Sequence, residues 1–181
     1  MDNLAGCYYR SRRYGDALKV SEDLLAIRKR RRGFEHADTI QAIGNVASVC
    51  FALGRTAEAL KYSRQAAELG EKLDRAENEN GDFLYVLACS RAIMAAVPGT
   101  ADAKESDSEA DWAMVYLKRA VIADQAISYM KRGDVAGLAA FKNIEHMKTD
   151  KDLDALRGRE DFKKLMAELQ AEKKAATKEE R

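Results

Sequence analysis

Cysteines and histidines are the side chains of this chain that could most readily bind a metal ion or act as nucleophiles. The cysteines are Cys7, Cys50 and Cys89, and the histidines are His36 and His146. None of them has the CxxC or Cys/His spacing that is typical of metal and redox motifs. Each cysteine stands among apolar residues, so we expect reduced core thiols, with a reactive or disulfide-forming thiol as the alternative. The sequence therefore predicts no metal site and no cofactor.

Motifs for catalysis are likewise missing from the sequence. It contains no glycine-rich phosphate loop, no dinucleotide-binding fingerprint and no Ser/His/Asp order. The carboxylate pair Asp152 and Asp154 stands in a charged segment, where we do not expect a raised pKa. Since the polar residues are expected on helix exteriors rather than converging in a pocket, we predict that the protein is not an enzyme.

The charge balance argues against nucleic acids and membranes as partners. With 31 basic and 30 acidic residues, the net charge of +1 gives no global field that attracts either. The basic run 28–32 is expected to end a helix and complement its dipole, with binding of an acidic peptide, an acidic loop or nucleic acid as the alternative. No apolar run reaches membrane-spanning length, and the first ten residues lack the apolar stretch of a secretion signal. We therefore expect a cytoplasmic protein.

The elements that must position these residues are helices. Hydrophobic residues make up 46% of the 181 residues, and the chain contains only 11 glycines and one proline. Such a composition supports a continuous core and favours long helices over an all-β or α/β fold. The sequence thus predicts an all-α protein.

An internal repeat is the strongest signal in the sequence. Shifting the chain by 42 residues aligns its beginning with a later stretch, and such a period is typical of a stacked array of similar units. The seven identical pairs are Asn3 and Asn45, Ala5 and Ala47, Arg13 and Arg55, Ala17 and Ala59, Leu18 and Leu60, Lys19 and Lys61, and Ser21 and Ser63.

Each unit is predicted to be a helical hairpin, because apolar residues recur at three- and four-residue spacing on both sides of a break such as Gly54. We expect units at about 1–32, 34–73 and 82–130, with a solvent-exposed acidic loop at 98–111 that interrupts the third. Trp112 is expected to anchor the helix that follows this loop. Residues 131–171 should form capping helices and 172–181 a charged tail, because the open end of a solenoid must be covered.

The repeated residues resemble the tetratricopeptide-repeat family, in its 42-residue variety found in kinesin light chains and in many bacterial proteins. The segments His36-Ala37-Asp38-Thr39, Asn45-Val46-Ala47, Gly54-Arg55 and Glu58-Ala59-Leu60 are similar to that family's pattern, with Ala37 in place of the usual proline. The resemblance implies a right-handed α-solenoid of antiparallel helix pairs with a C-terminal capping helix. Asp38 or Thr39 remains able to cap the helix that starts there.

The C-terminal run 146–162 is similar to the segment that closes repeat arrays in some bacterial, notably planctomycete, Ser/Thr kinases. Kinase signatures are missing from the sequence, which has neither HRD nor DFG. This resemblance implies a regulatory or docking part of a larger signalling protein.

The family resemblance also implies a binding groove. In such repeats the first helix of each unit lines a concave face, and an Asn before the Leu-Ala pair contacts the backbone of a bound peptide. We therefore expect peptide-binding residues at Asn3, Asn45 and Ser48, with Tyr9 and Phe51 as apolar walls, although these aromatics could instead pack between units. The predicted function is protein or peptide binding.

Structural self-association is the alternative function. The first unit begins almost at Asn3, so Leu4, Tyr8 and Tyr9 should be incompletely covered and could pair with a second copy. The predicted partner is thus a protein or peptide, with a homo-oligomer as the second hypothesis.

Overall fold

The computed structural model describes residues 2–74, 80–97, 103–132 and 144–179, and all regular secondary structure in these ranges is helical. The elements are α1 (Asp2–Arg10), α2 (Tyr14–Arg32), α3 (Ala37–Ala52), α4 (Thr56–Asp74), α5 (Gly81–Ala96), α6 (Ala103–Arg132), α7 (Ile144–Thr149), the 3-10 helix η2 (Lys151–Leu156) and α8 (Glu160–Glu179). The predicted all-α class is confirmed. None of the described helices is long and apolar enough to cross a membrane.

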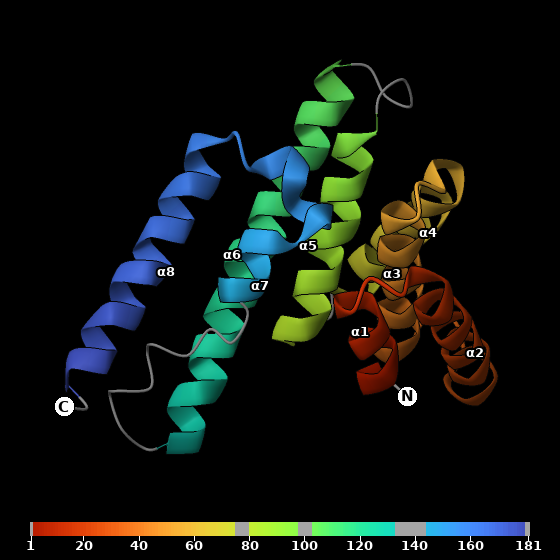
Figure 1. Ribbon diagram of the computed structural model, residues 1–181, viewed down its shortest axis with the longest axis horizontal. Coiled ribbons are helices and arrows are strands. Elements are labelled where there is room, and N and C mark those ends of the chain that lie inside the picture. Colours follow the sequence, from red (N-terminus) through yellow and green to blue (C-terminus); the bar gives the residue numbers. More distant parts are fainter. Residues whose placement is uncertain (1, 75–79, 98–102, 133–143, 180–181) are drawn as a thin grey trace.

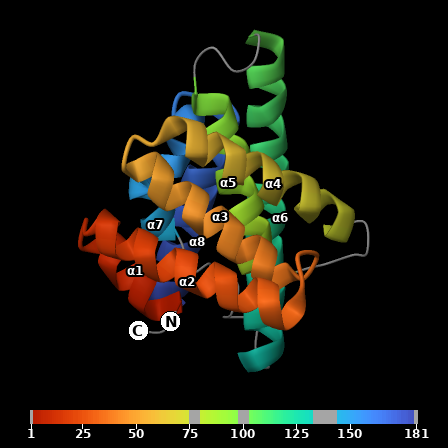
Figure 2. The same ribbon diagram turned by 90° about the vertical axis from the view of Figure 1, so that its right-hand side faces the viewer.

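Three helix pairs, α1–α2, α3–α4 and α5–α6, stack side by side and form a helical solenoid (Figure 1). The second helix of each pair contacts the first helix of the following pair, α2 with α3 and α4 with α5, and α3 also packs directly on α5. Figure 2 views the array from the end that carries α1 and α2. The arrangement places α1, α3 and α5 on a common face.

The first two pairs repeat in three dimensions as they do in sequence. Ala17 and Ala59 are both fully buried, and Ser21 and Ser63 are buried as well. At the start of the second helix of each pair, an arginine forms an ion pair with the acid three residues later: Arg13 with Asp16, and Arg55 with Glu58. Equivalent residues therefore occupy equivalent settings, and small buried residues let the paired helices approach closely.

The boundaries of α3 follow from local backbone chemistry. His36 is its N-cap, and His36 Nδ1 accepts a hydrogen bond of 3.1 Å from the Asp38 amide. The sequence had indicated Asp38 or Thr39 as the cap, but both lie inside the first turn of the helix. Beyond the helix, Gly54 has φ of 72°, a conformation that glycine adopts without steric strain and that lets the chain turn into α4.

The helices α3 and α5 approach each other closely at Gly44. A Cβ atom at this position would lie 2.2 Å from Val86 Cγ1, which is far inside van der Waals contact. The lack of a side chain therefore lets the first helices of the second and third pairs pack directly against each other.

The expectation of an acidic loop at 98–111 is wrong for residues 103–111, because these residues form the first turns of α6. Two acidic residues there form ion pairs: Arg91 of α5 binds Glu109 at 2.7 Å, and Arg159, directly before α8, binds Asp111 at 2.6 Å. The Ser106 hydroxyl also donates a hydrogen bond to the Ala95 carbonyl. These contacts stabilise a helix where the sequence pattern alone indicated a solvated loop.

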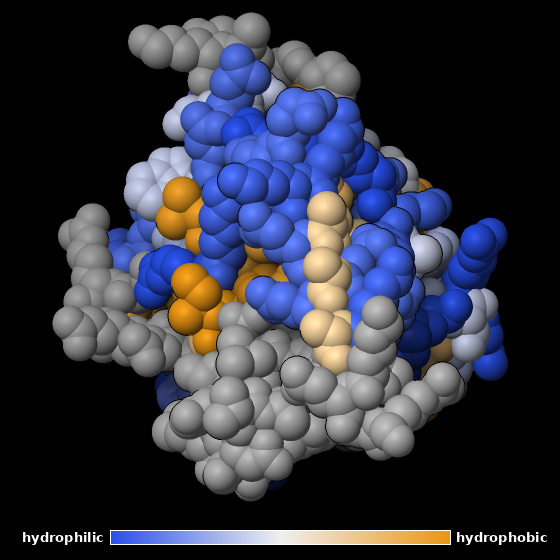
Figure 3. Space-filling model, turned by 90° about the vertical axis from the view of Figure 1, so that its left-hand side faces the viewer, coloured by the Kyte–Doolittle hydropathy of each residue, from blue (hydrophilic) through white to orange (hydrophobic). Residues whose placement is uncertain are grey.

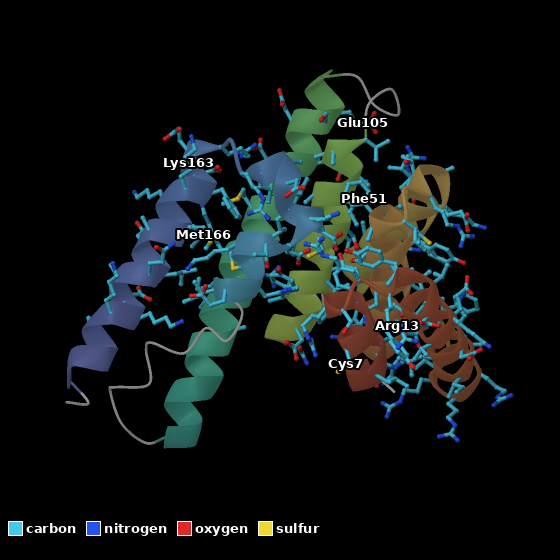
Figure 4. All side chains as sticks on the ribbon, viewed as in Figure 1. Cys7, Arg13, Phe51, Glu105, Lys163 and Met166 are labelled. Atoms are coloured by element: carbon cyan, nitrogen blue, oxygen red, sulfur yellow. The ribbon has the colours of Figure 1, made fainter. Side chains whose placement is uncertain are left out.

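The C-terminal elements cover the third helix pair. Phe162, Leu165, Met166 and Leu169 form the buried side of α8, and in Figure 4 Met166 points toward α6 while Lys163 points away from it. The outer side of α8 is hydrophilic (Figure 3). Residues 133–143 of the expected capping segment 131–171 lie outside the described residues.

One hydrophobic core joins the pairs and the C-terminal elements. It runs from Ala17 on α2 to Leu169 on α8 and includes Leu153 and Leu156 of η2, which are fully buried. Trp112 contributes less than expected, because 47% of its surface is exposed and its ring packs beside Tyr116.

Candidate functional site

A cavity of about 400 Å³ opens on the face formed by the first helices of the three pairs. Residues of α1, α3 and α5 form its walls, and His146, Asp150 and Asp152 close it from the C-terminal side. Figure 4 shows side chains from these elements converging near the centre of the molecule, between α1, α5 and the segment that contains α7 and η2. The C-terminal segment thus supplies part of the surface that the repeats alone would form.

Three of the five predicted binding residues line this cavity. Tyr9 of α1 and Asn45 and Ser48 of α3 are among its lining residues. Phe51 is not, and instead packs against the hydrophobic core. Asn3 belongs to α1, but the position of its side chain lies outside the described residues.

Tyr9 stays a neutral hydrogen-bonding group in this setting. Burial raises the pKa of its hydroxyl far above the ordinary value, and the negative charges of Asp152 and Asp150 raise it further. Its ring packs edge-on against Tyr14 at 5.3 Å between ring centres. Tyr9 therefore offers an aromatic wall and a protonated hydroxyl to a ligand.

Asp150 connects the C-terminal segment to α5. The Tyr85 hydroxyl donates a hydrogen bond of 2.7 Å to Asp150 Oδ2, and His146 Nε2 lies 3.1 Å from the same oxygen. Asp150 Oδ1 accepts a hydrogen bond from the Asp152 amide and so caps η2. Asp150 is 4% exposed, so these contacts replace the water that its carboxylate has lost.

The contacts between His146 and Asp150 shift both pKa values in the direction of an ion pair. The hydrogen bond to Asp150 raises the pKa of His146 although burial opposes it. Burial alone would raise the pKa of Asp150, but hydrogen bonds from His146 and Tyr85 outweigh burial and lower it. The carboxylate of Asp150 is therefore held in its charged form.

Asp152 is buried, and one of its carboxylate oxygens has no hydrogen-bond partner in the described part of the chain. The residue is 2% exposed, and its Oδ1 atom has no hydrogen-bond partner among the described residues. Burial raises its pKa well above the ordinary value, and the nearby charge of Asp150 adds to the rise, whereas a hydrogen bond with Ser48 opposes it. The expectation that the pKa of Asp152 is not raised was wrong, because Leu153 and Leu156 insert into the core and carry η2 inward.

Cys89 of α5 lies beside the two carboxylates. Its Sγ atom is 3.8 Å from Asp150 Oδ2, and burial raises the pKa of the thiol. The expectation of buried free thiols is confirmed for Cys50 and Cys89, but Cys7 is exposed on α1. The Cys89 thiol is thus held close to acidic oxygens in a water-poor environment.

Tyr85 and Asp150 were missed by sequence reasoning. They are separated along the chain by 65 residues, so no local spacing brings them together. A usable signal was Asp150 three residues before the apolar Leu153, since an aspartate is a preferred N-cap residue and Leu153 and Leu156 indicate a short helix with a buried side.

The basic run 28–32 contacts the start of the next helix pair. Arg28 donates a hydrogen bond of 2.7 Å to the Asp38 carbonyl, and Arg32 lies 3.1 Å from the Asp38 carboxylate and from His36. These contacts agree with the interpretation of the run as a helix end.

Comparison with known protein families finds a similarity in the N-terminal part of the chain. Residues 1–72 match the family model of the tetratricopeptide repeat. Neither the curated proteins nor the solved structures gave a match. The matched residues cover α1 to α3 and most of α4, which are the two helix pairs that repeat in sequence and in space. Residues 1–72 are therefore similar to tetratricopeptide repeats.

Proposed function

We propose that the cavity between α1, α3 and α5 docks an extended peptide segment of another protein. Tetratricopeptide repeats generally mediate protein–protein interactions and are typically non-catalytic, and their concave faces provide the binding surface. The observation that carries the proposal is the cavity of about 400 Å³ on the face of the first helices, with Asn45 on its wall.

The polar side chains of α3 suit the backbone of such a segment. Asn45 and Gln41 both line the cavity, and each side-chain amide offers a donor and an acceptor. These groups can pair with a peptide unit whatever its side chain. Tyr9 and Tyr85 supply aromatic surface on the flanking helices, which favours a segment with an apolar or flat side chain.

The finer resemblance of the repeats to those of kinesin light chains, and of the C-terminal run to bacterial kinase tails, supports a cytoplasmic docking part of a signalling protein. Asn3 and Asn45 would then act together as a clamp. Both lie on the first helix of their pair, at positions that the 42-residue shift makes equivalent.

A peptide-display selection followed by titration tests this proposal. Peptides selected on the full chain are labelled, and their affinities are measured by fluorescence polarisation for the wild type and for Gln41→Ala/Asn45→Ala. Each lost hydrogen bond contributes about 1 kcal/mol, so we expect binding to weaken about 10-fold or more in the double variant.

Gln65→Ala is the matched control, because this glutamine lies on α4, away from the cavity of the first helices. Equal affinities for the wild type and Gln41→Ala/Asn45→Ala would refute docking at this face. So would a selection that yields no saturable binder.

Self-association is a second candidate, favoured by Leu4 of α1, of which 47% is exposed. Sedimentation velocity at several concentrations separates the two functions. A monomer throughout contradicts self-association, whereas a dimer that Leu4→Ser dissociates supports it.

A further inference from the structure

We propose that Cys89, Asp150 and Asp152 form a binding site for a divalent metal ion of the zinc class at the floor of the cavity. One sulfur and two carboxylate oxygens from these residues lie within 4.8 Å of one another. All three residues are buried, and all three line the cavity, which supplies a path for an ion to enter. This inference does not depend on peptide docking.

The unmatched oxygen of Asp152 points to a missing cation. Asp152 Oδ1 is buried without a partner in the described part of the chain, and such a group is destabilising unless something positive or a donor pairs with it. Its neighbour Asp150 does not supply that partner, because a second carboxylate repels it. A bound cation would compensate both acids at once.

The thiol of Cys89 selects a metal ion rather than an ammonium group. A thiol is a weak hydrogen-bond acceptor for an amine, whereas sulfur is a preferred ligand of zinc and related ions. Calcium and magnesium are coordinated almost entirely by oxygen, so they are disfavoured beside Cys89. The mixture of one sulfur and two carboxylates fits a borderline ion such as Zn²⁺.

The observed separation between Cys89 and Asp150 agrees with such coordination. Their Sγ and Oδ2 atoms are 3.8 Å apart. With metal–sulfur and metal–oxygen bonds of about 2.3 and 2.0 Å, two tetrahedral ligands would lie about 3.5 Å from each other. This pair therefore needs only a small contraction, the ligand atoms of all three residues lie within 4.8 Å of one another, and a fourth position remains for water or a ligand group.

The surroundings of Asp150 resemble the supporting contacts of metal sites. His146 Nε2 and the Tyr85 hydroxyl both contact Asp150 Oδ2, and the Asp152 amide binds its Oδ1. Hydrogen bonds of this kind orient a ligating carboxylate. A bound ion would link α5 to the segment between α7 and η2.

Cobalt substitution provides a direct test, because Co²⁺ bound to a thiolate shows a charge-transfer band that oxygen ligands do not give. The full chain, stripped with a chelator, is titrated with Co²⁺ and, separately, with Zn²⁺ while thermal unfolding is followed by circular dichroism. We expect saturation at one equivalent, the charge-transfer band, and a rise in the unfolding temperature with Zn²⁺.

Three variants assign the site. Cys89→Ser should lose the charge-transfer band. Asp152→Asn should bind the metal ion at least about 10- to 100-fold more weakly, because the loss of a residue that only hydrogen-bonds to a metal ligand already has an effect of this size. Cys7→Ser, which alters the exposed thiol of α1, should behave as the wild type. Helical circular dichroism confirms that each variant is folded.

The proposal is overturned if the wild type shows no saturable binding in the micromolar range. It is also overturned if the band survives in Cys89→Ser or disappears in Cys7→Ser, since the ion would then bind elsewhere. Wild-type binding and the Cys7→Ser result decide these outcomes even if Cys89→Ser does not fold.

Discussion

The hydroxyl of Tyr85 on α5 lies 2.7 Å from Oδ2 of Asp150, and this buried hydrogen bond attaches the C-terminal segment to the face of the repeats. Tyr85→Phe removes the donor and leaves a charged acceptor less well compensated. We expect the free energy of unfolding to fall by about 2 kcal/mol, as is usual for buried hydrogen bonds to charged groups. Urea unfolding followed by circular dichroism measures the change.

Tyr8→Phe is the matched control, because Tyr8 contacts Arg13 through its ring, which the substitution keeps. If both variants unfolded at the same urea concentration as the wild type, the bond between Tyr85 and Asp150 would not stabilise the fold.

The close approach of α3 and α5 gives a steric prediction at Gly44. Gly44→Ala places a methyl group against Val86, and the helices must shift, so we expect a loss of about 1–3 kcal/mol. At Gly15 of α2 nothing lies within 4 Å of an added Cβ, and alanine is the better helix former. Gly15→Ala should therefore be neutral or stabilising. Comparable destabilisation by both substitutions in urea unfolding would contradict the proposed steric contact.

Arg91 of α5 joins three helices through two ion pairs, one with Glu71 of α4 and one with Glu109 of α6. Arg91 is 9% exposed, so Arg91→Ala leaves Glu109 in a poorly hydrated place without its cation. We expect the free energy of unfolding to fall by about 3 kcal/mol. The double variant Arg91→Met/Glu109→Gln should be more stable than Arg91→Ala, because it also removes the negative charge of Glu109, which would otherwise lack its cation.

The exposed pair of Arg55 and Glu58 offers the comparison, since such pairs contribute little to stability. If Arg55→Ala destabilised the protein as much as Arg91→Ala, burial of the Arg91 pairs would not be the cause.

The start of α8 should respond to acid. The hydrogen bond from Arg159 lowers the pKa of Asp161 although burial opposes it. Because the folded state holds the charged form, this contact contributes stability above the unfolded pKa of about 4 and loses it as pH falls through the lower folded value. Asp161→Asn should therefore be less stable than the wild type at pH 7, and the difference should vanish in acid.

Unfolding temperatures measured from neutral pH down to acid, at low salt, test this dependence. Glu160→Gln serves as the control, because the Glu160 side chain is 90% exposed and pairs with Lys163 at the same helix end. A stability difference between Asp161→Asn and the wild type that does not change with pH would show that the charge of Asp161 is not responsible.

The repeated part of the fold could be predicted because its information is local and occurs twice. Ala17 and Ala59 recur at the same register with the same burial, and Gly54 takes the positive φ that its place after a helix requires. The same register brought Asn45 and Ser48 to the cavity.

The rest depended on contacts between distant residues. The helical residues 103–111 form ion pairs with Arg91 and Arg159, and the sequence around residues 103–111 does not predict these ion pairs. Asp152 belongs to a segment rich in charge, and only the insertion of Leu153 into the core explains why it is buried. The hydropathy of a short sequence window cannot predict the burial of a charged residue that follows from contacts made by its neighbours.

The position of η2 affects how the helical array should unfold. In an ideal solenoid each unit touches only its neighbours, so the ends can fray while the middle stays folded. Here η2 packs on α5 and also reaches α3, which ties the second and third pairs to a segment far along the chain. Loss of order in any one of these elements removes support from the others, and the molecule should melt cooperatively in a single step instead of unzipping pair by pair.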